Sequence, residues 1–238
     1  MRGWLGSQAI RKFLGSTGIN MELENLTTDF KHIAIEGVIG AGKTSLTLKL
    51  SKFLNARPVL EEFEENPFLD KFYDDIQHYA FQTQIFFLLS RFKQQQQLTQ
   101  MDIFEQMIVS DYMFEKDKIF AYLNLQDDEL RLYESLVSLL EKSVPKPDLV
   151  VYLQCNVDHL MANIRKRGRK FERSISKEYI QSLNEAYNYF FFRYKSAPLL
   201  IVNGDQIDFV NDENDFNRLA AEILKPRKVA EYYNPILK

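Results

Sequence analysis

The sequence contains a single cysteine, Cys155, among its 238 residues, so no disulfide bond can form within the chain. This scarcity is typical of proteins from a reducing compartment. A basic surplus is also missing, because 30 lysines and arginines stand against 33 acids and the formal net charge is −3. Proteins that bind duplex nucleic acid usually carry such a surplus, since contacts to phosphates supply much of their affinity. The composition therefore predicts no nucleic-acid partner.

Long apolar runs are missing as well. A membrane-spanning helix needs about 20 apolar residues, and the longest candidate, IFFLLS at 85–90, is far shorter. We therefore expect no membrane partner and a cytoplasmic location.

The first twenty residues contain no acid but carry Arg2, Arg11 and Lys12, a composition that loosely resembles a transit peptide. We interpret residues 1–27 as a poorly ordered leader, or Met1 as an upstream start codon with Met21 as the true start. If residues 1–20 are a transit peptide instead, the expected location becomes mitochondrial.

Strand and helix patterns alternate along the chain. Apolar runs with β-branched residues predict five buried strands, at 32–37, 57–62, 106–111, 148–154 and 198–202. Helical patterns fall at 43–54, 66–98, 127–144, 157–168, 176–194 (with Ser176 as N-cap) and 214–224. This order predicts a parallel sheet with helices on both faces. We therefore expect one three-layer α/β/α domain of the P-loop NTPase type with five parallel strands over residues 28–226, and a C-terminal tail at 227–238.

A glycine-rich loop joins the first predicted strand to the first predicted helix. Residues 37–44, GVIGAGKT, match the phosphate-binding pattern Gly-x-x-x-x-Gly-Lys-Thr in full. Glycines let backbone N–H groups turn inward, and with the helix N-terminus these groups form an anion cradle. We therefore expect ATP to bind to Gly37, Val38, Ile39, Gly40, Ala41, Gly42, Lys43, Thr44 and Ser45.

Two side chains of this loop have separate expected roles. Lys43 would reach the β- and γ-phosphates, and the Thr44 hydroxyl would bind Mg²⁺. A glycine-rich turn without a ligand is the alternative, but a strand before and a helix after favour the phosphate loop. The Asn-Lys-x-Asp signature of GTPases is absent and the chain is short for a large ATPase motor. A small kinase must also bind a second substrate and close over both.

Glu61 and Glu62 end the second predicted strand. In a doubly wound sheet the carboxyl ends of the strands face the ligand crevice, where a carboxylate can take a proton from an attacking hydroxyl. The alternative is an exposed acidic loop, because EEFEEN contains four acids in six positions.

With this segment, EEFEENP at 61–67, the sequence resembles the deoxyribonucleoside kinase family, especially its bacterial deoxyadenosine and deoxyguanosine kinases. The similarity runs through most of residues 31–225. In that family a Glu-Pro-Val segment supplies the general base for the 5′-hydroxyl, and the resemblance places this base at Glu61. Glu62 stands in place of the family's proline, so an alignment of the motif shifted by one residue stays open.

The resemblance implies a deoxynucleoside site on the following helices. Tyr73 lies eleven residues before Gln84, as the family's sugar-binding tyrosine lies before its base-reading glutamine. Gln84 and Arg91 are seven residues apart and share one helix face, and a glutamine amide offers both a donor and an acceptor. The alternatives are a buried structural glutamine at 84, or Gln82 as the reader from another face of the helix.

SDYMFEKD at 110–117 resembles the family's acid-Arg-Ser motif after the third strand. Asp111 matches the acid, which implies a place near Mg²⁺ and the transferring phosphate. Tyr112 stands where the family has an arginine, so Lys116 or a mobile arginine would have to substitute.

Asp117 matches an acid that reads the base together with the arginine at Arg91 in members that accept purines and cytosine. The resemblance therefore implies deoxyadenosine, deoxyguanosine or deoxycytidine rather than thymidine. A structural ion pair between Arg91 and Asp117 is an alternative that is compatible with this role.

IRKRGRKFE at 164–172 resembles the family's arginine-rich lid. Arginine forks match phosphate oxygens and can neutralise charge on a transferring group. Arg167 and Arg169 match lid arginines, and Arg165 is an additional cation that we assign to the nucleotide. The alternative is a solvated or nucleic-acid-binding basic loop.

Three further positions complete the comparison with the family. Asn163 stands where an earlier lid arginine is expected. Glu172 matches a glutamate that touches the sugar 3′-hydroxyl. NGDQIDF at 203–209 resembles an adenine-side loop in which Phe209 borders the base.

Together these matches imply a Mg²⁺- and ATP-dependent kinase that phosphorylates the 5′-hydroxyl of a deoxynucleoside in nucleotide salvage. Glu61 would be the base, assisted by Lys43, Asp111 and the lid arginines. The resemblance also implies a homodimer formed through helices. One alternative is a thymidylate-type nucleoside monophosphate kinase. The other is a nucleotide-binding regulatory protein, which stays open because Tyr112 replaces the family's arginine.

Overall fold

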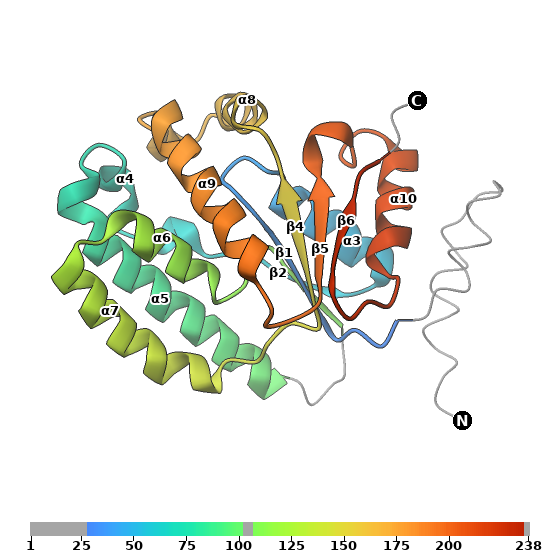
Figure 1. Cartoon of the computed structure of the whole chain (residues 1–238), viewed down its shortest axis with the longest axis horizontal. Coiled ribbons are helices and arrows are strands. Elements are labelled where there is room, and N and C mark those ends of the chain that lie inside the picture. Colours follow the sequence, from blue (N-terminus) through green and yellow to red (C-terminus); the bar gives the residue numbers. More distant parts are fainter. Residues whose placement is uncertain (1–27, 102–106, 236–238) are drawn as a thin grey trace.

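The computed structural model describes residues 28–101 and 107–235, and its middle layer is a parallel β-sheet (Figure 1). The strands lie in the order β2-β3-β1-β4-β5-β6. Their bounds are β1 His32–Gly37, β2 Arg57–Val59, β3 Ile108–Ser110, β4 Leu149–Gln154, β5 Leu199–Asn203 and β6 Ala230–Tyr233. Ala34 at the centre of β1 lies opposite Ser110 of β3 and Val150 of β4. The leader expected at residues 1–27 lies outside the described residues.

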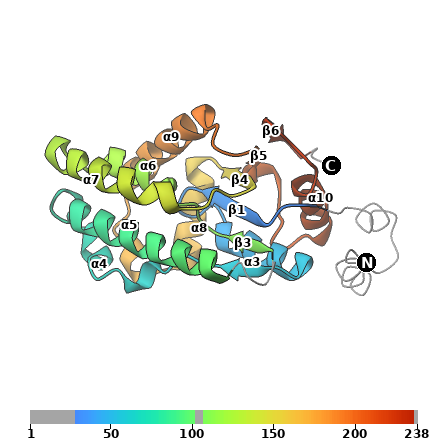
Figure 2. The ribbon, with the colours of Figure 1, turned by 90° about the horizontal axis from the view of Figure 1, so that it is seen from below.

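Helices cover both faces of the sheet. α3 and α10 lie on one side, and α6 and α9 lie on the other (Figures 1 and 2). α5, α6 and α7 pack against one another in a helical layer beside the sheet (Figure 2). The bounds are α3 Lys43–Leu54, α4 Leu69–Phe72, α5 Ile76–Met101, α6 Lys116–Asn124, α7 Asp127–Leu140, α8 Val157–Arg167, α9 Lys177–Arg193 and α10 Glu213–Ile223. The α/β/α arrangement predicted from the sequence is confirmed.

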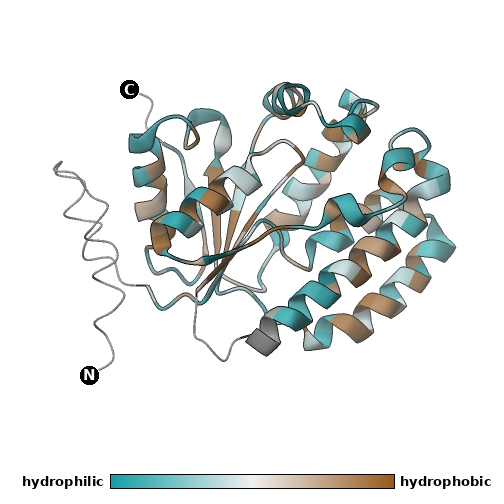
Figure 3. Ribbon diagram, turned by 180° about the vertical axis from the view of Figure 1, so that it is seen from behind, coloured by the Kyte–Doolittle hydropathy of each residue, from teal (hydrophilic) through white to brown (hydrophobic). Residues whose placement is uncertain are grey.

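The buried apolar residues of the described chain form several clusters, and one of them surrounds the sheet. The central strands read as near-continuous apolar runs because helices cover both of their faces, and Ile33, Ala34 and Ile35 are fully buried. Figure 3 shows the hydrophobic colour concentrated in the strands, while most helices carry both colours. A second apolar cluster lies between α5, α6 and α7 and consists of Leu88, Phe114, Ala121, Tyr133 and Val137. Each fully buried large side chain stabilises the fold by about 1.5–3 kcal/mol.

Local chemistry sets the ends of the helices around the site. The Ser176 hydroxyl accepts the N–H of Tyr179 at 3.0 Å, so the N-cap predicted for α9 is confirmed. α8 ends at Gly168, whose φ of 66° is the left-handed conformation that a helix C-terminus favours. Among the described residues, no helix has the length and apolar character that crossing a bilayer requires.

The prediction of five strands is wrong, because a sixth strand adds to the sheet. β6 pairs in parallel with β5 and comes from residues 227–238, where the sequence predicts a tail. Its residues Ala230–Tyr233 alternate between exposed and half-buried positions, as an edge strand does, so they form no apolar run.

Two helical predictions also differ from the structure. The single helix expected at 66–98 is two helices, and the break falls before Asp75, whose carboxylate accepts the N–H of His78 at 3.2 Å in the first turn of α5. α6 was not predicted, because it has only 9 residues and directly follows the irregular segment after β3.

Candidate active site

The glycine loop joins β1 to α3 through a tight turn. Gly40 and Gly42 have φ angles of 90° and 88°, which side chains rarely adopt. A Cβ atom at Gly40 would lie 2.6 Å from the Leu160 carbonyl oxygen, so α8 packs directly on the loop. A Cβ atom at Gly42 would lie 3.0 Å from the Phe209 ring. The strand–loop–helix context that the phosphate-loop pattern requires is therefore present.

Lys43 folds back over this loop. Its Nζ atom donates to the carbonyl oxygens of Gly37 at 2.7 Å and Val38 at 3.1 Å. Burial, followed by the positive charge of Lys116, lowers the pKa of Lys43 to about 8. The ammonium group is thus held at the mouth of the loop by neutral acceptors, where a phosphate oxygen is a stronger partner.

Asp111 joins the glycine loop to the end of β2. Its Oδ2 atom accepts the Thr44 hydroxyl at 2.6 Å, and its Oδ1 atom accepts the backbone N–H of Glu61 at 2.8 Å. A hydroxyl and a carboxylate side by side are the hard oxygen donors that Mg²⁺ prefers. Thr44 and Asp111 therefore fit the magnesium ligands expected from the sequence.

Glu61 lies between two cations. Its Oε1 atom accepts from Arg91 Nε at 2.8 Å and Nη2 at 2.6 Å, and its Oε2 atom accepts from Lys116 Nζ at 2.7 Å. Burial alone would raise the pKa of Glu61, but the charges of Lys116 and Arg91 outweigh it and hold the pKa far below its ordinary value. The neighbouring Glu62 is exposed, so the structure points the first of the two acids toward the site.

Asp117 lies behind Arg91 and does not line the cavity. Arg91 Nη1 pairs with its Oδ1 atom, and the Tyr133 hydroxyl donates to its Oδ2 atom at 2.9 Å. The Gln84 amide donates to the Asp117 backbone oxygen at 2.9 Å. Asp117 is 1% exposed. Its carboxylate therefore fixes Arg91, which itself faces the cavity, and the structural ion pair considered from the sequence is present.

One cavity collects the residues predicted for catalysis and for the acceptor; we call it the acceptor cavity. Glu61, Lys43, Thr44 and Asp111 line one part of it. The predicted substrate residues Tyr73, Gln84 and Arg91 line another part, whereas the competing Gln82 is exposed. Its aromatic walls are Phe63, Phe72, Tyr73, Phe87, Phe120, Phe171 and Tyr187. Flat apolar walls with a few convergent polar groups suit a nucleoside.

The lid closes this cavity through an ion-pair cluster. Glu172 is 5% exposed and accepts from Arg167 Nε at 3.1 Å, and Arg169 lies 3.6 Å from the same carboxylate. The Arg169 guanidinium also stacks over the Phe63 ring at 4.1 Å. Both arginines and Glu172 line the acceptor cavity. The additional cation Arg165 is exposed and lines neither this cavity nor the next one described.

A second cavity lies on the other side of the glycine loop; we call it the donor cavity. Gly40, Ala41, Gly42 and Ser45 line it, and Phe209, whose ring packs close to Gly42, lines it as well. Ile39 faces the acceptor cavity instead, and Val38 is buried. Arg167 lines both cavities and so stands between the two expected substrates.

Asn163 and Lys166 are among the residues of the donor cavity that sequence reasoning missed. Asn163 donates from Nδ2 to the Gly40 carbonyl oxygen at 2.8 Å, so the residue in place of the expected arginine braces the glycine loop. Lys166 lines the cavity where Arg165 was expected. Neighbouring residues of a helix point in different directions, and only the position of α8 over the loop decides which of them reaches it.

Tyr112 occupies a different environment from the one its motif implied. Its side chain is fully buried and packs with Val59 and Ile108, away from the cavity. Lys116, one turn along the chain, lines the cavity instead.

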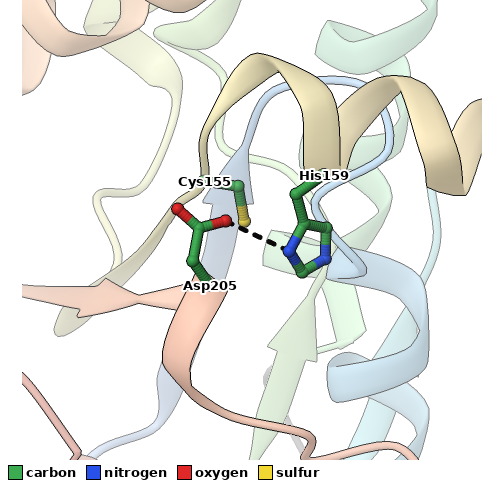
Figure 4. A group of neighbouring side chains, drawn as sticks. All are labelled: Cys155, His159 and Asp205. Carbon is green, nitrogen blue, oxygen red and sulfur yellow. Dashed lines mark ion pairs between the residues drawn. The ribbon is translucent and has the colours of Figure 1, made fainter.

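Cys155, His159 and Asp205 gather where β4 and β5 end (Figure 4). These residue types can bind metals, but the Asp205 carboxylate already accepts the Asn156 N–H at 2.9 Å and lies 3.1 Å from His159 Nδ1. Burial raises the pKa of the Cys155 thiol to about 12, which opposes the thiolate form that metals need. The cluster therefore braces the start of α8 against the loop after β5.

Comparison with known proteins agrees with this geometry. A sequence profile of the deoxynucleoside kinase family matches residues 33–226. The deoxyguanosine kinase of Bacillus subtilis is 38% identical over 196 residues, which cover 80% of this chain and 95% of that protein. The deoxyadenosine kinase of Dictyostelium discoideum is 37% identical over 199 residues, which cover 80% of this chain and 78% of that protein.

Solved structures give the same result. The deoxyadenosine kinase of M. mycoides with bound dATP superimposes with a TM-score of 0.70 and 28% identity, covering 79% of this chain and 98% of that one. The profile spans the glycine loop, the acceptor cavity and the lid. The chain is an enzyme, a nucleotide-binding phosphotransferase, and it belongs to the deoxynucleoside kinase family.

Proposed function

We propose that this enzyme transfers the γ-phosphoryl group of ATP to the 5′-hydroxyl of a deoxynucleoside and that its role is nucleotide salvage. One observation carries the proposal: the phosphate loop, a buried carboxylate and the lid arginines line one cavity with aromatic walls. A deoxynucleoside fits those walls, and the donor cavity beyond the loop suits ATP. The names of the relatives support the same acceptor class.

Glu61 is the proposed base, since its carboxylate faces the cavity beside the phosphate loop. The 5′-hydroxyl oxygen attacks phosphorus while its proton passes to Glu61. Lys43, Arg167 and Arg169 contact the phosphate oxygens, and Phe209 lies beside the adenine. Most of the acceleration then comes from positioning and charge stabilisation.

Thr44 and Asp111 are the proposed ligands of Mg²⁺. Their oxygen atoms lie 2.6 Å apart beside Lys43. The ion, when bound, supplies positive charge to the β- and γ-phosphate oxygens.

Base selection is assigned to Gln84 and Arg91, with Asp117 holding Arg91 in place. The amide and the guanidinium both face the cavity and can bind the edge of a purine or of cytosine. Tyr73 and Glu172 are assigned to the sugar. This arrangement supports deoxyadenosine, deoxyguanosine or deoxycytidine over thymidine.

A homodimer through α6 and α9 is also proposed. Tyr122 is 60% exposed and Tyr189 is 64% exposed on one hollow of these helices, and Phe192 nearby is 77% exposed. Such an aromatic group at the surface suits a protein interface. The cytoplasmic location stays a prediction.

The experiment is transfer of radiolabelled phosphate from ATP with Mg²⁺ to deoxyadenosine, deoxyguanosine, deoxycytidine, thymidine and thymidine monophosphate in parallel. Glu61→Gln should lower kcat by roughly 10²- to 10⁴-fold, the usual size of a general-base contribution. Glu62→Gln is the matched control and should stay within about threefold. Labelling of the monophosphate alone would support the monophosphate kinase alternative, and ATP binding with no labelled product would support the regulatory one.

A further inference from the structure

Lys116 is a buried cation that the proposed mechanism does not use. It opens α6, is 3% exposed and lines the acceptor cavity. Removing an ammonium group from water is unfavourable unless a partner compensates. In the described part of the chain its acceptor is Glu61 Oε2, at 2.7 Å.

The two cations on Glu61 are held very differently. Arg91 binds both Glu61 and Asp117, and Asp117 is itself fixed by the Tyr133 hydroxyl. The Arg91 guanidinium therefore cannot leave without stranding a buried carboxylate. Lys116 holds one acid through a flexible stem of four carbons, so its ammonium group can move.

A second ammonium group lies close to Lys116. Lys43 sits at the mouth of the glycine loop, and the charge of Lys116 follows burial among the causes that lower its pKa. The buried Glu36 interacts electrostatically with both lysines and accepts the N–H of Met113 at 2.8 Å, which anchors the turn into α6. Two like charges held together at one cavity favour an anion between them.

Of the other cations that line the cavity, Arg91 pairs with both Glu61 and Asp117. Arg167 and Arg169 share Glu172 on the lid, and neither is paired with Glu61 among the residues that the structure describes. Tyr112, whose position in the motif implied a cation, points into an apolar cluster. Lys116 is therefore the cation best placed to serve both Glu61 and the phosphoryl group.

We propose that Lys116 is a catalytic residue whose ammonium group passes from Glu61 to the phosphoryl group during transfer. This inference rests on the proposed function. With ATP bound, the ammonium group contacts a γ-phosphoryl oxygen, and Glu61 Oε2 becomes free to accept the hydroxyl proton. The O5′–P bond forms as the bond from phosphorus to the bridging oxygen breaks, ADP leaves with that electron pair, and the proton resides on Glu61.

The first test compares Lys116→Met with Lys116→Arg, using the deoxynucleoside that the wild type phosphorylates. Removing one charge-stabilising donor lowers kcat by about 10²- to 10³-fold, and we expect that loss in Lys116→Met. The KM for the deoxynucleoside should stay within about threefold, because the lost contact is to the phosphoryl group. Lys116→Arg should regain at least about tenfold, since the charge returns.

Lys118→Met is the matched control. Lys118 lies on the same helix, but its side chain is partly exposed and pairs with Glu141 outside the cavity. Its kcat should equal that of the wild type. Thermal unfolding of every variant separates a loss of rate from a loss of fold.

Chemical rescue separates a catalytic lysine from a structural one. Methylammonium added to Lys116→Ala should restore kcat with saturation, because the small cation fills the space of the lost side chain, and it should leave Lys118→Ala unchanged. If Lys116→Met does not fold, Lys116→Arg and the rescued Lys116→Ala decide the question. The proposal is wrong if Lys116→Met keeps kcat within threefold, or if folded Lys116→Arg is as slow as folded Lys116→Ala and the amine restores nothing.

Failure of the proposed function gives a different pattern. If the wild type phosphorylates none of the deoxynucleosides, the proposed function is wrong, and the role of Lys116 falls with it. A wild type that phosphorylates one of them, with Lys116→Met equally fast, overturns the role of Lys116 alone.

Discussion

Glu61 and Lys43 line the same cavity. Burial disfavours the charged form of both side chains, but their neighbours differ, so their charged forms are stabilised to different degrees. Neighbouring cations keep Glu61 ionised, and its pKa is far below its ordinary value. Lys43 has neutral carbonyl acceptors and a like-charged neighbour, and its pKa falls to about 8. The Glu61 carboxylate is therefore ionised near neutral pH, whereas the Lys43 ammonium group loses its proton at a pH only slightly above neutral.

This difference predicts how the affinity for ATP depends on pH. Lys43 is mostly charged below about pH 8 and mostly neutral above it, and only the charged form attracts phosphate. The dissociation constant of ATP should therefore rise by roughly tenfold or more between about pH 7 and 9.5, a window set by that pKa. Isothermal titration calorimetry in the absence of deoxynucleoside measures it.

Lys43→Arg is the control, because a guanidinium group stays charged throughout this range. Its affinity for ATP should be nearly independent of pH. The same pH dependence in wild type and Lys43→Arg would mean that another group titrates.

Sequence patterns located the residues whose roles depend on the backbone motif or on a fixed spacing. The phosphate loop, Glu61, Arg91 and the lid arginines were each identified in this way. Lys116 and Asn163 were not assigned their contacts, because those contacts depend on how α6 and α8 pack against the sheet. Asp117 was placed beside the base, and only the packing of α7 on α5 shows that it lies behind Arg91.

At the scale of elements, the strands of the sheet centre were predictable and the edge strand β6 was not. β1, β4 and β5 are buried on both faces and read as apolar runs. β6 is half exposed, and its pattern of alternating exposure in four residues is too short to separate from a loop. The division into a domain at 28–226 and a tail stays a proposal, with β6 attached to the sheet from beyond that boundary.

Two neighbouring tyrosines of β6 test which interactions hold this edge strand on the sheet. Tyr233 packs against the main core, whereas Tyr232 is 64% exposed. Tyr233→Ala should lower the free energy of unfolding by about 1–3 kcal/mol, and Tyr232→Ala should change it by less than about 0.5 kcal/mol. Denaturant titration of both variants measures the difference. Equal losses would indicate that the backbone pairing with β5, and not the buried ring, holds β6.

At the scale of the whole molecule, α6 and α9 expose an aromatic face within the part of the chain that the structure describes. If this face joins two copies, Phe192→Glu places a charge in an apolar interface and should convert the dimer into a monomer. Light scattering coupled to size-exclusion chromatography measures the mass. Leu139→Glu is the control, because Leu139 is 68% exposed on α7, away from that face.

A dimer that persists in Phe192→Glu, or that is lost in Leu139→Glu, would place the interface elsewhere. A monomeric wild type at the concentrations used would rule out a stable homodimer.

Arg167 lines both cavities, and this shared position bears on the order in which ATP and the deoxynucleoside bind. A side chain shared by two ligands couples their binding free energies, and that coupling is the same in both directions. The factor by which ATP changes the affinity for the deoxynucleoside must equal the factor by which the deoxynucleoside changes the affinity for ATP. The coupling through Arg167 alone therefore favours neither substrate as the first to bind, so a preferred order has to arise from the separate affinities of the free enzyme or from the binding rates.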